Sequence, residues 1–114
     1  MHELAITQSV VDVVRRRTGD RRVSTVRLQV GRLSGVVPDA MQFCYELVVA
    51  GTPLADSSLE FELTPGQGHC RTCGADTELT DLILLCQCGS ADVEVVAGKE
   101  LRVISVELEA QPCA

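Results

Sequence analysis

The chain has 114 residues, of which 46% are apolar, and it carries a formal net charge of −6. This length supports one compact domain with a small aliphatic core, because the sequence contains only two Phe, one Tyr and no Trp. An acidic chain with so few aromatic residues is a poor match to nucleic-acid binding.

Residues 4–18 carry apolar side chains at helical intervals and polar side chains between them. We predict an amphipathic helix that ends at Gly19, after three arginines that suit the negative end of the helix dipole. A docking patch for an acidic partner is the alternative interpretation of these arginines. Residues 24–30 then alternate between apolar and polar side chains, which predicts a strand with one buried face.

A second helix is predicted from Pro38 onward, after a glycine-containing turn at residues 31–35. Apolar residues recur in it at i, i+3, i+4, i+7 and i+8, namely Ala40, Phe43, Cys44, Leu47 and Val48. We expect this stripe to face the core, so that Cys44 is a buried and unreactive thiol.

Two further alternating segments, residues 59–64 and 101–109, are predicted strands. We expect the glycines after Pro65 to end the first of them, and the aliphatic residues at 79–85 to form short strands beside the cysteines. The order of elements predicts an α+β fold, with a three-stranded sheet, two helices on one face and an inserted zinc-ribbon-like arm. We place the α/β domain at residues 1–65 and 98–111, and the inserted domain at residues 66–97.

The inserted segment contains two close cysteine pairs, Cys70/Cys73 and Cys86/Cys88. Such pairs can place four sulfurs at the corners of a tetrahedron, which is the geometry of a closed structural zinc site. Two disulfides or a dithiol redox site are the alternatives, and His69 could replace one thiolate. Polar residues interrupt the start of the chain where a signal peptide would need an apolar run, and no segment could span a membrane. We therefore expect a reducing cytoplasm, where paired cysteines more often bind metal.

The first three residues offer a second metal site. If Met1 is retained, the terminal amine, the His2 amide and the His2 imidazole can chelate one ion in adjacent rings, and Glu3 could add an oxygen. Nitrogen donors in a planar set suit Ni(II) or Cu(II). From these residues alone, the simpler explanation is favoured, which is an exposed histidine and a glutamate at a helix start. No catalytic motif occurs, so we do not expect an enzyme.

Several separated motifs resemble the HypA/HybF family. They lie at residues 1–4 (MHEL), 30–38 (VGRLSGVVP), 51–52, in the cysteine pairs, and at 88–90 and 98–101 (GKEL). Proteins of this family are nickel metallochaperones for [NiFe]-hydrogenase maturation. The resemblance therefore implies that Met1, His2 and Glu3 bind Ni(II) as transient cargo. It also implies that the cysteine quartet, Cys70, Cys73, Cys86 and Cys88, binds a structural Zn(II).

The resemblance also implies the partners. They are a HypB-type GTPase, the [NiFe]-hydrogenase large subunit precursor and, in some organisms, urease maturation proteins, with neither nucleic acid nor membrane among them. The sequence departs from the family at Cys86-Gln87-Cys88, where the family usually has C-x2-C, and this departure affects the zinc geometry. Competing functions are a zinc-ribbon adaptor that binds nucleic acid and a thiol redox switch. Salt-dependent nucleic-acid binding or reversible thiol titration would identify these.

Overall fold

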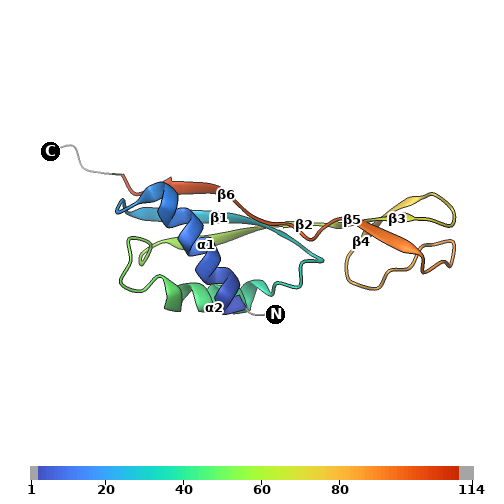
Figure 1. Ribbon diagram of the computed structural model, residues 1–114, viewed down its shortest axis with the longest axis horizontal. Coiled ribbons are helices and arrows are strands. Elements are labelled where there is room, and N and C mark those ends of the chain that lie inside the picture. The colour runs from blue at the N-terminus through green and yellow to red at the C-terminus, as the bar shows by residue number, and fades with distance from the viewer. Residues whose placement is uncertain (1–2, 111–114) are drawn as a thin grey trace. The chain divides into compact units, whose positions relative to one another are not determined.

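A computed structural model of the chain describes residues 3–110. Its elements, in chain order, are α1 (Glu3–Thr18), β1 (Val23–Gly31), α2 (Pro38–Val48), β2 (Ser58–Thr64), β3 (Gly66–Cys70), β4 (Asp76–Leu79), β5 (Val93–Ala97) and β6 (Leu101–Leu108) (Figure 1). The strands form two three-stranded sheets, with orders β2-β1-β6 and β4-β3-β5. Within the described residues, the chain divides into two compact units, one of residues 3–28, 37–61 and 103–110 and one of residues 29–36 and 62–102. The predicted α+β fold, with its cysteine-bearing arm, is confirmed.

The first unit contains both helices, which pack against each other beside the sheet β2-β1-β6 (Figure 1). Helix α1 contributes a buried valine face, and the central strand β1 contributes alternate buried residues, as its period of two predicted. These core residues include Val10, Val11, Val14, Val26 and Leu28. Burying each such side chain stabilises the fold by about 1.5–3 kcal/mol. In the described part of the chain, neither helix is long and apolar enough to cross a membrane.

Helix α2 is present as predicted, but the predicted buried face was wrong. Phe43 and Leu47 are 64% and 61% exposed, and Cys44 is only half-buried. The row that faces the core has a spacing of four and consists of Met41, Tyr45 and Val49. Apolar residues lie on two faces of this helix, so their periodicity alone could not select the face that packs.

The second unit is built around β3, which pairs antiparallel with both β4 and β5. The predicted break in the strand after Thr64 is confirmed, because β2 ends there, but a further strand that was not predicted, β3, begins at Gly66. A Cβ on Gly68 would lie 2.7 Å from the Val93 side chain and 2.8 Å from that of Leu79, so glycine lets these side chains pack against the strand. Of the aliphatic run at 79–85, only Leu79 lies in a strand.

Residues 29–36 belong to this second unit through close backbone contacts. The N–H of Gly31 donates to the carbonyl of Glu100 at 2.7 Å, and the N–H of Leu33 donates to the carbonyl of Gly98 at 2.7 Å. A Cβ on Gly31 would lie 2.0 Å from the carbonyl oxygen of Gly98, closer than any side chain can be accommodated. Glycine is therefore required at position 31, because only a residue without a Cβ lets the Gly98 backbone come this close.

We predict that Gly31→Ala lowers the free energy of unfolding by about 3 kcal/mol, because its methyl group meets backbone atoms that cannot move aside independently. Gly19→Ala is the matched control. Gly19 has a positive φ of 61° but open space around its Cβ position, so this change should cost only about 1 kcal/mol. Urea unfolding followed by circular dichroism measures both, and equal costs would contradict the close approach.

Candidate metal centre

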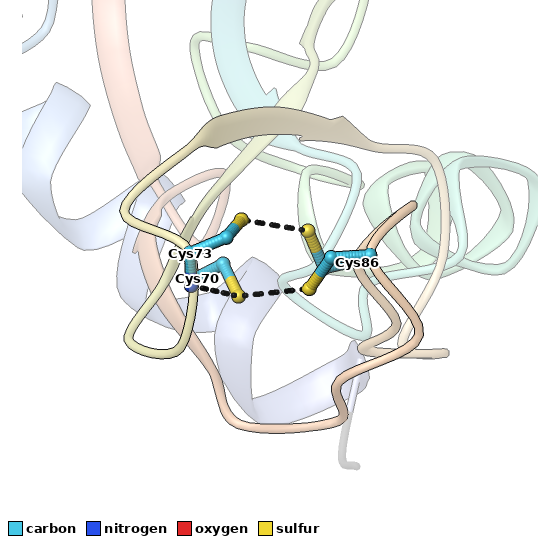
Figure 2. A group of neighbouring side chains, drawn as sticks. Cys70, Cys73 and Cys86 are labelled. Carbon is cyan, nitrogen blue, oxygen red and sulfur yellow. Dashed lines mark hydrogen bonds between the residues drawn. The ribbon is translucent and has the colours of Figure 1, made fainter.

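The four predicted ligands converge on one point. Cys70 ends β3 and Cys73 follows in the next turn, while Cys86 and Cys88 lie in the segment between β4 and β5. All four sulfurs lie within 4.8 Å of one another. The Sγ atoms of Cys73 and Cys86 are 3.6 Å apart (Figure 2), and those of Cys70 and Cys88 are 3.7 Å apart. None of these cysteines is in a disulfide.

These separations fit a tetrahedral metal ion. Zinc–sulfur bonds of about 2.3 Å place tetrahedral sulfurs about 3.8 Å apart, close to the two separations observed. Four thiolates in this arrangement are typical of Zn²⁺ among biological metal ions. The shorter Cys86-Gln87-Cys88 spacing therefore still delivers both sulfurs to the site.

One side of the cysteine cluster is packed against apolar side chains. Cys70 and Cys86 are buried, whereas Cys73 and Cys88 are exposed. The buried pair shares a small cluster with Leu33, Leu79 and Val93, against which Leu84 and Val95 also pack. Two ligands are thus held by packing as well as by any bound ion, and Leu33 links residues 29–36 to the site.

The turn at the first cysteine pair favours the thiolate form of Cys70. The N–H of Gly74 donates to the carbonyl of Cys70 at 2.9 Å, and the N–H of Cys73 points at the Cys70 sulfur at 3.5 Å. This backbone donor lowers the pKa of Cys70 to about 6. The turn therefore prepares one ligand for a cation before the ion arrives.

The second pair turns more sharply. The N–H of Gly89 donates to the carbonyl of Cys86 at 2.9 Å, and Gly89 has a positive φ of 93°. The N–H of Ser90 lowers the pKa of Cys88, but the Cys86 thiol and burial outweigh it, and the pKa rises to about 12. Thiols this close together resist deprotonation, because the negative charges of neighbouring thiolates repel each other. A bound divalent cation offsets this repulsion.

His69 lies beside the cysteine quartet but outside it. Its Nδ1 is 2.8 Å from Oδ1 of Asp76, its directly paired residue across β3 and β4. The metal-binding group in the described residues consists of the four cysteines alone. The Asp76 contact could not be predicted from the sequence, because it depends on the register of two strands.

The predicted N-terminal site is only partly visible. Met1 and His2 lie outside the described residues, as does Cys113. Glu3 is half-buried and is the first residue of α1.

Residues 1–108 match the model of a family described as "Hydrogenase/urease nickel incorporation, metallochaperone, hypA". The chain belongs to the HypA family. A hydrogenase maturation factor HypA from Geobacter metallireducens is 44% identical and is aligned over 96% of this chain and 100% of its own length. The HypA of Nostoc sp. PCC 7120 is 39% identical and is aligned over 96% of each chain.

The fold of the HypA family is also found among solved structures. The solution structure of the Ni metallochaperone HypA from Helicobacter pylori matches with a TM-score of 0.66 at 20% identity. The match covers 97% of this chain and 100% of the Helicobacter pylori chain. This chain therefore has the fold of that HypA structure.

We predict that the purified protein contains one zinc per chain with a first shell of four sulfurs at about 2.3 Å. Metal analysis and X-ray absorption at the zinc edge measure the content and the shell. His69→Ala is the control and should leave the spectrum unchanged, because His69 contacts Asp76 instead of the cysteines. A nitrogen in the first shell that disappears in this variant would contradict the four-cysteine site.

Proposed function

We propose that this chain is a nickel metallochaperone that binds one Ni(II) at its N-terminus and transfers it during [NiFe]-hydrogenase maturation. Met1, His2 and Glu3 are the proposed nickel ligands. The observation that carries the proposal is the family match from residue 1 to residue 108, which includes these three residues and the cysteine quartet. The relatives named above are hydrogenase maturation factors.

The start of α1 supports a chelate that uses backbone nitrogen. The first N–H groups of an α-helix have no partner within the helix. Because α1 begins at Glu3, the proposed nickel ligands stand in the sequence at and just before the start of this helix. The positive end of the helix dipole also favours the negative charge of a deprotonated amide. The Glu3 carboxylate can then add an oxygen ligand in an expanded shell.

A terminal site also suits transfer. A nickel ion held by few ligands at a chain end is easier to release to a recipient than an ion in a closed cage. Copper is expected to bind such nitrogen donors more tightly than nickel. Selectivity must then come from the metal supply and from contact with partner proteins.

We assign Zn(II) to the cysteine quartet as a structural ion. Two of its ligands are buried in the apolar cluster, which favours retention over transfer. The proposed partners are a HypB-type GTPase, the [NiFe]-hydrogenase large subunit precursor and urease maturation proteins, and the proposed location is the cytoplasm. In this role the protein carries metal and catalyses no reaction.

We predict that extra residues before Met1 sharply weaken nickel binding, because they remove the terminal amine. That amine has a reference pKa of about 7.7–8.0, so nickel must displace protons from it and the apparent affinity should rise with pH. Calorimetric nickel titration of the native and extended proteins between pH 6.5 and about 8 measures both effects.

His2→Ala is the companion variant and should also lose the site. Equal nickel affinity in the native and extended forms would eliminate the amine as a ligand, even if His2→Ala still abolished binding. Full nickel binding by His2→Ala would contradict the N-terminal site itself.

A further inference from the structure

The segment that leads into Cys86 exposes three large aliphatic side chains. Leu82, Ile83 and Leu85 are 64%, 71% and 56% exposed. They lie on a non-helical, non-strand segment within six residues of a metal ligand. We call residues 82, 83 and 85 the aliphatic loop patch. Such a group of exposed apolar side chains typically marks a surface that another molecule covers.

The loop is fixed at several points. Leu79 is buried at the end of β4, Leu84 packs against the cluster that contains the cysteines, and Cys86 is a metal ligand. Within the loop, the N–H of Ile83 donates to Oδ1 of Asp81 at 2.9 Å. Leu84 therefore faces inward while its neighbours face outward. A surface held in this way loses little conformational entropy when a partner binds.

The chain segment that carries the patch is acidic, and its carboxylates Glu78 and Asp81 form no ion pair within residues 3–110. Residues 72–98 contain no Lys or Arg and five carboxylates, which are Asp76, Glu78, Asp81, Asp92 and Glu94. The adjacent Arg71 is already engaged, at 2.9 Å from Asp92 and 3.8 Å from Glu94. The charge complementary to this apolar patch is therefore positive.

We propose that the aliphatic loop patch is a docking surface for a maturation partner that presents an apolar pocket edged by Lys or Arg. This rests on the proposed function, since the partner is one of the proteins that exchange nickel with this chain. In a symmetric dimer, a second copy of the chain would place these acidic segments against each other. An anionic membrane surface would repel the same carboxylates. A basic-edged protein pocket satisfies both the apolar and the charged features.

The test uses two purified probes, the HypB-type GTPase and the [NiFe]-hydrogenase large subunit precursor. Their affinities are measured for the wild type, for Leu82→Ser/Ile83→Ser/Leu85→Ser and for the matched control Phe43→Ser/Leu47→Ser. The control removes exposed apolar residues from α2, at 64% and 61% exposure. The loop variant should lose about tenfold or more in affinity for at least one probe, whereas the control should retain that affinity.

A second variant tests the charge. Glu78→Gln/Asp81→Asn removes two carboxylates and keeps the Oδ1 acceptor at position 81, so it preserves the loop. It should lower the affinity for the same probe and reduce the dependence of binding on salt concentration. Zinc content is measured for every variant. If the triple variant loses zinc, the probe affinities of Ile83→Ser and of the charge variant are used to test the docking surface instead.

The contrary outcomes are distinct. Unchanged affinity for both probes in the loop variants, or no binding of either probe to the wild type, overturns the docking surface. Patch-dependent binding to vesicles containing anionic phosphatidylglycerol overturns it in favour of a membrane, and patch-dependent dimerisation in sedimentation overturns it in favour of a second copy. Nickel titration of the same samples separates these results from the proposed function, because intact N-terminal nickel binding leaves that function standing.

Discussion

The second unit depends on four sulfurs held within 4.8 Å of one another. As thiolates, sulfurs at such separations would repel each other, and a cation at their centre offsets that repulsion. The apolar cluster around them is small, with five buried members of which two are the cysteines Cys70 and Cys86. A core of this size cannot offset the chain entropy of residues 62–102 by burial alone. Metal binding must supply the remaining free energy of folding.

The same centre explains why distant parts of the sequence belong together. Leu33 packs in the cysteine cluster, and Gly31 meets Gly98 through backbone atoms. The motifs at residues 30–38 and 98–101 therefore contact each other directly. From the sequence they look like independent turns. In the structure, glycine at position 31 permits the approach of Gly98, and glycine at position 98 permits the approach of Gly66.

Elements with strong periodicity could be predicted from the sequence, and elements that depend on tertiary packing could not. The helix at the N-terminus, the second helix and the strands at β1, β2 and β6 follow from apolar spacing. Strand β3 begins with glycines that sequence rules assign to turns, and its pairing explains them. In α2 the apolar spacing predicted the helix but not which of its two apolar faces is buried, and the face containing Phe43 is exposed. The cysteine ligands were predictable because knuckle spacing is local, whereas the His69–Asp76 contact needed strand register.

The account assigns separate stabilising forces to the two units, with apolar burial in the first and metal in the second. Residue-resolved amide hydrogen exchange, measured with metal bound and after chelation, tests this most directly. The account predicts that chelation removes protection from residues 62–102 and 29–36, while α1 and α2 keep theirs. Retained protection in residues 62–102, or simultaneous loss throughout both units, would contradict it.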